Sequence, residues 1–185
     1  MLSATSVREE LKQRRASLSA EEIQRRSLAV QQRVISLGDF IRAGTLALYS
    51  AFRGEVETGR LMQEGFSRGK RVVFPRVSEE RLDFVAVDSS TVFHPGPWGV
   101  AEPAAGRTVA VTEIDLMVLP GLAFDRRCFR LGWGKGYYDR VLDNYQGVCL
   151  GLAYDFQILP ELPIREGERP LDFVVSEETV LRRSS

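Results

Sequence analysis

The start of the chain has the pattern of two helices, over residues 5–17 and 19–37. The second has an approximate apolar stripe, formed by Ile23, Leu28, Val30, Val34 and Leu37. Ser19 followed by Glu22 is the pattern of a capping box, and Gly38 is expected to end this helix. The first helix is basic and is most simply interpreted as a solvated face, which would include Arg8, Lys12, Arg14 and Arg15.

Short apolar runs in the rest of the chain alternate with helical segments. Residues 45–51 predict a strand, 58–68 a helix and 70–75 a second strand. This β-α-β order implies a parallel pair of strands with a right-handed crossover. The remaining expected elements are strands at 83–87, 115–119, 148–153 and 172–176 and a helix at 137–145.

Two stretches between these elements are less regular. Residues 89–107 are rich in proline and glycine and predict a long loop over a ligand site rather than a linker. Residues 109–111 are short and apolar, and the sequence does not decide their type. Together the elements predict an α/β fold, a three-layer α/β sandwich around a mostly parallel central sheet. We expect a single domain over residues 1–185, with the helical pair of residues 1–38 packed on the α/β core.

The composition narrows the class of protein. The chain has 185 residues, enough for one domain with a buried core, and 25 Lys plus Arg balance 25 Asp plus Glu. Without net charge, no strong field favours nucleic acid or an acidic membrane. No apolar run approaches the ~18 residues of a membrane-spanning helix, and the start lacks a signal-peptide pattern. We therefore expect a cytoplasmic protein without nucleic-acid or membrane partners, and we expect it to be a monomer.

The cysteines and the histidine do not predict a catalytic or metal site. Cys128 and Cys149 lack metal-ligand spacing and partner histidines, which favours reduced thiols in a reducing compartment. His94, the single histidine, precedes Pro95 and is better explained as a surface loop residue than as a catalytic one.

Residues 115–140, DLMVLPGLAFDRRCFRLGWGKGYYDR, carry the strongest candidate for chemistry. An apolar strand ends at Pro120-Gly121, and ligands of α/β sheets bind in the crevice where such strands end. The positive end of the expected helix at 137–145 would point at the same place. Asp139 falls in its first turn, where a carboxylate could hold a divalent cation against phosphate. Compensation of the helix dipole is an equally good interpretation of Asp139.

Three alternating glycines, Gly132, Gly134 and Gly136, allow the backbone to turn tightly and bring its N–H groups against an anion. Arg130 and Lys135 add full positive charges on either side. The spacing is neither that of a Walker loop, which needs Ser or Thr after the lysine, nor that of a Rossmann fingerprint. A polyphosphate cradle is the functional interpretation, and a flexible connecting turn is the alternative.

The stretch PGLAFDRRCFRLGWGKGYYDR resembles the signature of the 5-formyltetrahydrofolate cyclo-ligase family, also called 5,10-methenyltetrahydrofolate synthetases. Weaker matches follow in the family's order along nearly the whole chain. They are LKQRRASLSAEE near the start, GEVET at 54–58, GKRVVFPRV at 69–77 and WGVAEP at 98–103. The central motif is highly specific, and the others would mean little alone.

The resemblance implies an ATP- and Mg²⁺-dependent ligase acting on a reduced folate. ATP would transfer its γ-phosphoryl group to the formyl oxygen of 5-formyltetrahydrofolate, because hydroxide is a poor leaving group. N10 would then attack, and phosphate would depart to leave the methenyl bridge. Such a reaction requires positioning and charge stabilisation rather than a covalent nucleophile.

The resemblance also implies which residues bind ATP and stabilise charge. Arg8 matches an N-terminal arginine that contacts ATP phosphates. Lys135, Arg130 and Tyr137 are the catalytic candidates, with Lys135 near the β- and γ-phosphates. The residues expected around the triphosphate are Arg130, Leu131, Gly132, Trp133, Gly134, Lys135, Gly136, Tyr137 and Tyr138. A core role is the alternative for Tyr137 and Tyr138.

For the folate, the resemblance makes Glu55 the substrate anchor, with its carboxylate accepting hydrogen bonds from the pterin. From the residues alone, Glu55 is better explained as a charge at a helix start. Ser50, Trp133 and Tyr137 are expected to line the same pocket, and Phe52 and Trp98 would either wall the pterin or belong to the core. The metal ligands implied are Asp139 and Glu168.

Three residues depart from the family pattern. Ala4 stands where a lysine is usual, Cys128 where glycine is usual, and Glu168 where aspartate is common. If position 128 requires a positive φ, the turn before Arg130 is strained or rearranged. These departures keep open a second hypothesis, a folate- or nucleotide-binding relative without turnover. A sugar-phosphate or acyl-transfer protein, the third hypothesis, would need a catalytic base that the sequence does not offer.

Overall fold

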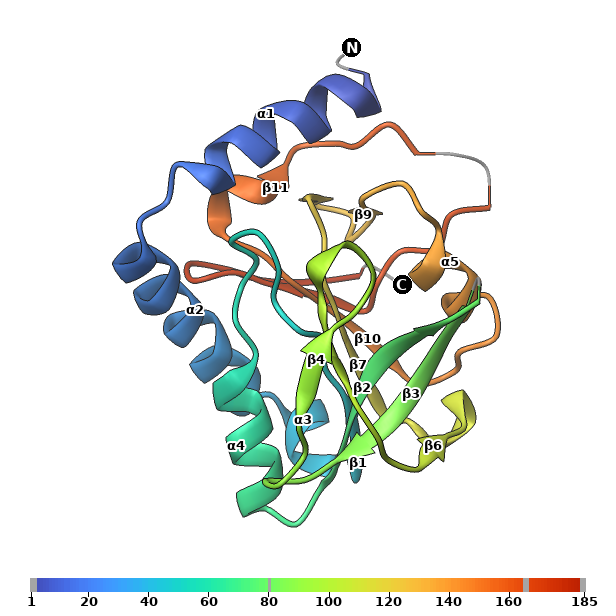
Figure 1. The fold of residues 1–185 in the computed structure, drawn as a ribbon. Coiled ribbons are helices and arrows are strands. Elements are labelled where there is room, and N and C mark those ends of the chain that lie inside the picture. Colours follow the sequence, from blue (N-terminus) through green and yellow to red (C-terminus); the bar gives the residue numbers. More distant parts are fainter. Residues whose placement is uncertain (1–2, 80, 165–166, 184–185) are drawn as a thin grey trace.

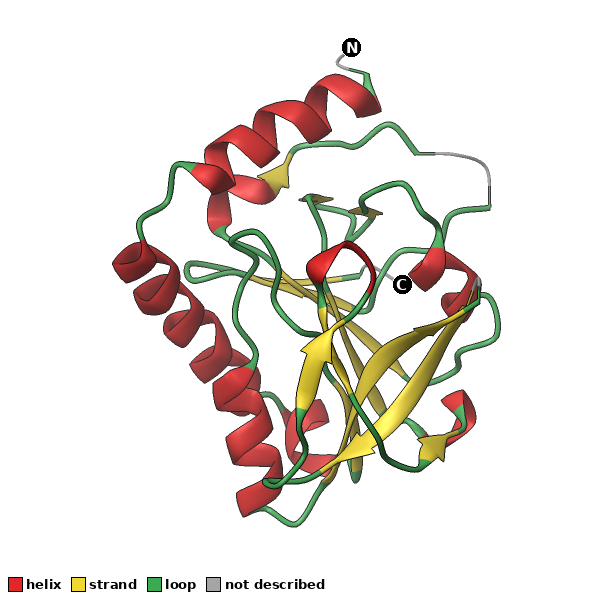
Figure 2. Cartoon of the chain, in the orientation of Figure 1, coloured by secondary structure: helices red, strands yellow, loops and turns green. Residues whose placement is uncertain are grey.

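The computed structural model describes residues 3–79, 81–164 and 167–183, and Figures 1 and 2 show helices gathered around a central sheet. The α-helices are α1 (Ala4–Ala16), α2 (Ala20–Ile35), α3 (Gly38–Arg42), α4 (Gly59–Ser67) and α5 (Tyr137–Leu142). Short 3-10 turns are η1 (Pro97–Gly99), η2 (Val111–Glu113) and η3 (Asp155–Gln157). Over the described residues, none of these helices has the length and apolar character needed to cross a membrane.

The main sheet has the strand order β13-β12-β10-β7-β1-β2-β3-β6. Its members are β1 (Thr45–Ala47), β2 (Arg71–Ser78), β3 (Arg81–Val87), β6 (Thr108–Val109), β7 (Leu116–Leu119), β10 (Val148–Leu152), β12 (Phe173–Val175) and β13 (Val180–Arg182). The pairs β12-β10, β10-β7, β7-β1 and β1-β2 are parallel, whereas the pairs β13-β12, β2-β3 and β3-β6 are antiparallel. The smaller sheets are β11-β8-β9 and β4-β5, formed by β4 (Phe93–Pro95), β5 (Ala101–Pro103), β8 (Ala123–Asp125), β9 (Arg130–Leu131) and β11 (Ile158–Leu159).

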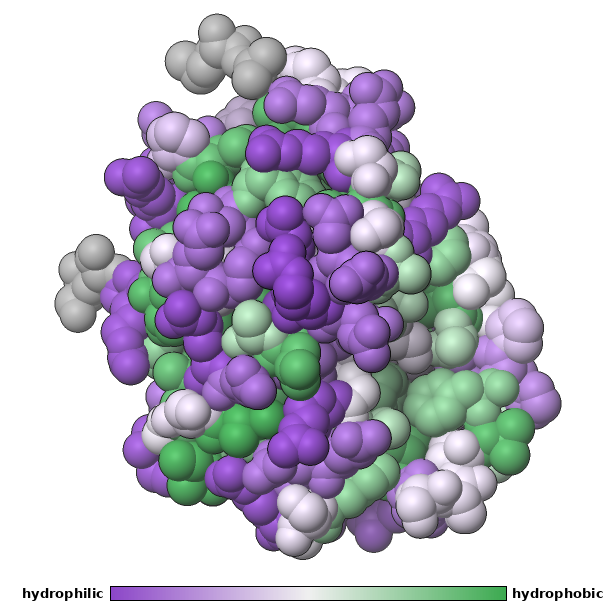
Figure 3. Space-filling model, turned by 90° about the vertical axis from the view of Figure 1, so that its left-hand side faces the viewer, coloured by the Kyte–Doolittle hydropathy of each residue, from purple (hydrophilic) through white to green (hydrophobic). Residues whose placement is uncertain are grey.

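The two faces of the sheet are covered differently. Figure 1 shows α2 and α4 along one side, where Val34 and Leu61 belong to the same buried cluster as Leu46 of β1. On the other face, Leu142 of α5 packs with Ala47 and other buried residues. Leu46 and Ala47 thus point to opposite faces, as neighbours in a strand must. Figure 3 looks onto the helical side, where hydrophilic residues predominate and hydrophobic ones form smaller groups.

The structure confirms the predicted fold class, a mixed α/β fold with a mostly parallel central sheet. The capping box of α2 is also confirmed, since Ser19 Oγ accepts from the Glu22 N–H at 3.2 Å and Glu22 Oε2 accepts from the Ser19 N–H at 3.0 Å. The predicted end of this helix was wrong. It ends at Ile35, and Gly38 instead begins α3, with Leu37 as its N-cap.

Several predicted boundaries were also wrong, and tertiary contacts explain most of the differences. Strand β1 covers residues 45–47 rather than 45–51, and α5 ends at residue 142 rather than 145. The runs at 70–75 and 83–87 extend toward each other and pair antiparallel as the β2–β3 hairpin. The predicted loop at 89–107 contains a second hairpin, β4–β5. The undecided stretch at 109–111 joins the end of β6 to the start of η2.

Candidate active site

A cleft of about 760 Å³ opens where the chain leaves the carboxyl ends of the parallel strands. Its walls come from segments that follow β1 and β7, from the β2–β3 hairpin and from η1. Ligands of α/β sheets bind at this edge, because the loops that follow the parallel strands converge there. The cleft brings together all the residues predicted for ATP, folate and metal, namely Arg8, Ser50, Glu55, Arg130, Leu131, Gly132, Trp133, Gly134, Lys135, Gly136, Tyr137, Tyr138, Asp139 and Glu168. The individual roles stay predictions.

The glycine loop, residues 132–136, has a backbone that depends on glycine. Gly134 and Gly136 have φ angles of +96° and +70°, in the region that residues with a Cβ rarely adopt. The carbonyl of Gly132 accepts a hydrogen bond from Arg8 Nε at 2.9 Å, so α1 is tied to this loop. Lys135 is exposed at the cleft, with Nζ 5.7 Å from the centroid of the Trp98 ring. The loop is therefore an open turn with three basic side chains, including Arg130, around it.

Arg130 and Asp139 form an ion pair at the edge of the cleft. The Arg130 side chain is 8% exposed, and its Nη1 also donates to the carbonyl of Pro120 at 3.2 Å. Asp139 is 69% exposed, which leaves its second carboxylate oxygen accessible. Because α5 has only 6 residues, it aligns fewer peptide dipoles than the predicted helix would have done. The charge at this edge is therefore dominated by side chains.

Within the described ranges, no three His, Cys, Asp or Glu side chains gather as a ready metal cage. Asp139 and Glu168 nevertheless line the same cleft from two different segments, and both are exposed. Mg²⁺ bound beside phosphates commonly uses one or two carboxylates and keeps several waters. These two residues therefore fit a nucleotide-bound Mg²⁺ rather than a metal site formed by protein alone.

Glu55 lies at the inner end of the cleft and is buried. Its Oε1 accepts from Trp133 Nε1 at 3.0 Å, and its Oε2 accepts from the N–H of Phe52 at 3.1 Å. Arg15 Nη1 lies 3.7 Å from Oε1. Burial raises the pKa of the Glu55 carboxyl, while the Arg15 guanidinium and the hydrogen bonds from Trp133 and Phe52 oppose that shift. The prediction of a helix-start charge was wrong, because Glu55 precedes α4 and is not its N-cap.

Arg15 is the residue of this cluster that sequence reasoning missed. Its side chain is 1% exposed rather than solvated, and burial lowers the pKa of its guanidinium. Nε donates to the carbonyl of Arg53 at 3.1 Å, and Nη1 donates to that of Gly121 at 3.4 Å. A signal was present, because Val7, Leu11 and Arg15 are spaced four apart and form the buried side of α1.

The aromatic residues of the cleft divide into exposed and packed ones. Trp98 is 54% exposed, so the alternative of a core role was wrong for it. The centroids of the Trp98 and Tyr137 rings are 5.7 Å apart, and both residues line the cleft. Tyr138 packs against a buried cluster, as the core alternative predicted, and burial raises the pKa of its hydroxyl. Phe52 is half-buried, with its ring centroid 6.4 Å from that of Trp133.

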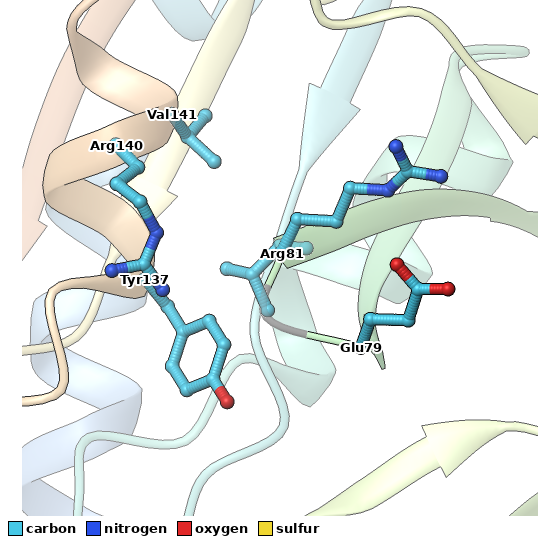
Figure 4. A pocket seen from close by; sticks show the side chains of 6 residues that line it. Glu79, Arg81, Tyr137, Arg140 and Val141 are labelled. Carbon is cyan, nitrogen blue, oxygen red and sulfur yellow. The ribbon is translucent and has the colours of Figure 1, made fainter.

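A smaller hollow of about 270 Å³ adjoins the cleft and shares Leu82 and Tyr137 with it. Figure 4 shows Tyr137 and Arg140 on α5 facing the hairpin that carries Glu79 and Arg81. Tyr137 thus lines both the hollow and the cleft. The hollow lies toward the outside of the molecule, since Glu79 and Arg81 are both exposed.

Cys128 has φ of +67°, so the position where the family usually has glycine does require a left-handed backbone. Its N–H donates to the carbonyl of Asp125 at 2.9 Å, which closes the turn before Arg130. The thiol is buried, and burial raises its pKa to about 11. Cys128 and Cys149 are both free. His94 is exposed on β4 and is not among the residues that line the cleft.

Comparisons with known proteins identify a family for this chain. A curated mouse protein named 5-formyltetrahydrofolate cyclo-ligase is 34% identical to this chain, over 94% of this chain and 93% of its own length. The Escherichia coli K12 protein of the same name is 30% identical, over 92% and 98%. A solved NMR structure of Aquifex aeolicus 5,10-methenyltetrahydrofolate synthetase superposes with a TM-score of 0.89 at 34% identity, covering 98% of this chain and 93% of that one.

A solved structure of a Mycoplasma pneumoniae 5,10-methenyltetrahydrofolate synthetase, 24% identical, has the same fold with a TM-score of 0.79 and covers 95% of this chain and 99% of that one. A family model described as the 5-formyltetrahydrofolate cyclo-ligase family matches residues 2–177. With the sequence matches and the fold in agreement, the chain belongs to the 5-formyltetrahydrofolate cyclo-ligase family.

Proposed function

We propose that this protein cyclises 5-formyltetrahydrofolate to 5,10-methenyltetrahydrofolate, with conversion of ATP to ADP and phosphate. The observation that carries the proposal is the composition of one cleft. It joins a glycine loop and three basic side chains, which suit a triphosphate, to a buried carboxylate that suits the N–H groups of a pterin. The names of the relatives support the same reaction.

The chemistry needs an activated formyl oxygen. The γ-phosphoryl group passes from ATP to that oxygen, the C–O bond later breaks as N10 attacks the formyl carbon, and the oxygen leaves with phosphate. In this proposal, Lys135 stabilises negative charge on the phosphoryl group during transfer, and Arg8 and Arg130 hold the neighbouring phosphates. Gly134 and Gly136 have positive φ angles and no Cβ, so a phosphate can approach the backbone closely there. Bound Mg²⁺ would neutralise further phosphate charge.

The folate end of the cleft is formed by Glu55, Ser50 and the aromatic side chains. A carboxylate has several acceptor positions, so Glu55 can bind pterin N–H groups in a fork. Tyr137 and Trp98 are close enough to each other to wall a flat ring system. In this arrangement the formyl group would lie between the pterin pocket and the glycine loop.

Turnover is the experiment that tests the proposed function. The purified protein is expected to form the methenyl product, followed by its near-ultraviolet absorbance, only when 5-formyltetrahydrofolate, ATP and Mg²⁺ are all present. ADP and phosphate should appear in amounts equal to the product. Folate binding without ADP release would instead support the relative without turnover, which the departures at Ala4, Cys128 and Glu168 suggest.

The metal assignment gives a second prediction. Asp139→Asn is expected to raise the Mg²⁺ concentration needed for half-maximal turnover far more than Glu168→Gln does. Asp139 lies on the glycine-loop side, next to the phosphates, whereas Glu168 follows the family pattern less closely. Equal shifts in a magnesium titration would make Glu168 a full ligand. An unshifted titration for Asp139→Asn would leave Asp139 only as the ion-pair partner of Arg130.

Replacing Glu55 with glutamine is expected to weaken folate binding at least about tenfold. The variant keeps the size of the side chain but loses the charge, and hydrogen bonds to charged groups contribute roughly 1.5 to 3 kcal/mol. ATP binding in the absence of folate should hardly change, because the phosphates contact the glycine loop and the glutamine oxygen can still accept from the Trp133 indole of that loop. Calorimetric titration with each ligand separately tests this.

Glu57→Gln is the matched control for this prediction, since Glu57 lies two residues away in the same segment and is exposed. It should bind folate like the wild type. Loss of ATP binding together with folate binding in Glu55→Gln, or loss of neither, would remove Glu55 as a substrate anchor.

We also propose that the protein works as a monomer in the cytoplasm, where the thiols of Cys128 and Cys149 would stay reduced. Sedimentation at the mass of one 20.8 kDa chain is the expected result. A concentration-independent dimer would contradict it.

A further inference from the structure

Both oxygens of the Glu55 carboxylate already accept hydrogen bonds from the protein. The N–H of Phe52 binds Oε2, and the indole N–H of Trp133 binds Oε1 at 3.0 Å. Arg15 lies against the same Oε1 at 3.7 Å. With the side chain only 6% exposed, little room remains for two more donors from a ligand. A pterin that forks onto Glu55 must therefore take the place of one of these donors.

Among these donors, Trp133 is the least fixed, although Arg15, Lys12 and Arg53 lie 5.1, 5.6 and 5.9 Å from its ring centroid and would have to adjust when it moves. The Phe52 N–H belongs to the backbone that carries Glu55, and Arg15 is fixed by the carbonyls of Arg53 and Gly121. Trp133 is half-buried and belongs to none of the three hydrophobic clusters of the described chain. It stands between Gly132 and Gly134, and because glycine has no Cβ the backbone on either side can adopt conformations that other residues rarely reach.

We propose that Trp133 is a stand-in donor, which satisfies Glu55 in the free protein and is displaced by the pterin, so that folate binding moves the glycine loop. The proposal rests on the proposed function, since it concerns the same cleft. A buried carboxylate without a donor is costly, whereas replacing the indole N–H by a pterin N–H exchanges one hydrogen bond for another. The indole thus keeps Glu55 hydrogen-bonded until the substrate arrives.

This arrangement links the two ligands. Trp133 is part of the loop expected to hold the triphosphate, so a change in its position alters the N–H groups on either side. If folate binding changes nucleotide affinity by some factor, then nucleotide binding must change folate affinity by the same factor. Trp133 is accordingly a positioning residue that connects the folate pocket to the glycine loop. Its role is more than that of a side chain lining the pocket.

The decisive variant is Trp133→Phe, which keeps an aromatic ring but removes the N–H. In Trp133→Phe the pterin no longer has to displace a donor. The variant should therefore bind 5-formyltetrahydrofolate about tenfold more tightly than the wild type in the absence of nucleotide. A simple wall role predicts the opposite sign. The matched control is Trp98→Phe, at the other tryptophan of the cleft, whose ring contacts Tyr137 and Lys135 instead of Glu55. Its folate affinity should not rise.

A second measurement uses the wild-type protein and does not depend on how the variant folds. The indole N–H signals of the two tryptophans are resolved by ¹H–¹⁵N NMR and assigned with Trp98→Phe and Trp133→Phe. Addition of 5-formyltetrahydrofolate should shift the Trp133 signal strongly. In a separate titration, the affinity of the wild type for a non-hydrolysable ATP analogue should depend on whether folate is bound. This dependence should be lost in Trp133→Phe.

Either weaker or unchanged folate binding by a folded Trp133→Phe, or an unmoved Trp133 signal at saturating folate, overturns the proposal. Absence of any folate binding to the wild type would overturn the proposed function itself. The two failures are distinguishable, because only in the first does the wild-type protein give a folate titration.

Discussion

Replacing Lys135 with methionine is expected to lower the rate of cyclisation by about two to four orders of magnitude, the range found when a charge at a transferring phosphoryl group is lost. Lys135 is exposed in the cleft, and its ammonium group lies 5.7 Å from the centroid of the Trp98 ring. Methionine has a similar length but no charge, so the change removes electrostatic stabilisation while leaving the loop backbone able to form. Single-turnover rates at saturating ATP and folate give the measurement.

Two comparisons make this result specific. Lys135→Arg keeps the positive charge and should retain more activity than Lys135→Met. Thermal unfolding of Lys135→Met should match that of the wild type, because an exposed loop side chain contributes little to stability. A rate within a factor of a few of the wild-type rate, with unchanged thermal stability, would reduce Lys135 to a solvated loop charge.

Replacing Arg15 with methionine is expected to lower the free energy of unfolding by about 3 to 5 kcal/mol, the usual cost of removing one partner from a buried ion pair. Arg15 is 1% exposed and Glu55 6%, so neither charge is compensated by water. The variant also leaves the carbonyl of Arg53 without its donor, whereas that of Gly121 keeps a hydrogen bond from Gln157 Nε2 at 3.0 Å. Urea unfolding at neutral pH measures the loss.

The pH dependence of this loss follows from the pKa of Glu55. Burial raises the folded-state pKa of Glu55 above its ordinary value of 4.5, and Arg15 opposes that rise. Without Arg15 the pKa rises further, so the folded state loses stability as pH increases from the ordinary pKa through the raised one. The difference in unfolding free energy between Arg15→Met and the wild type should therefore be smaller at pH 5 than at pH 8.

Arg14→Met is the control for this prediction, because Arg14 is the neighbouring arginine of α1 and is exposed. It should change stability by no more than about 0.5 kcal/mol at either pH. A loss of the same size in both variants, or a deficit in Arg15→Met that grows toward acid pH, would contradict the proposed ion pair.

Local signals explain why much of the fold was predictable. The side-chain and backbone groups of Ser19 and Glu22 interact within one turn, so the start of α2 needs no tertiary information. Apolar runs such as 115–119 marked strands buried on both faces. The alternating glycines of residues 132–136 marked a turn whose positive φ angles the structure contains.

Boundaries and pairings were less predictable because they depend on partners distant in the sequence. The strands of the β2–β3 hairpin extend beyond the apolar runs at 70–75 and 83–87, because they pair with each other along residues 71–78 and 81–87. The hairpin within 89–107 has little hydrophobic pattern of its own, since β4 and β5 have only three residues each and include polar ones, His94 and Glu102. Gly38 could equally follow one helix or begin the next, and only the position of Leu37 as an N-cap decides between them.

The sequence by itself determined the fold class and the glycine loop, because each depends on short-range pattern or on a contiguous motif, whereas Arg8, Glu55 and Glu168 were predicted for the site only through the family resemblance. Only the tertiary structure revealed that Arg15, Glu55 and Trp133 form one cluster. They come from α1, from the segment after β1 and from the glycine loop, and no local pattern links these segments. Burial decides their chemistry, because a charge removed from water needs a partner and the fold alone selects which side chain supplies it.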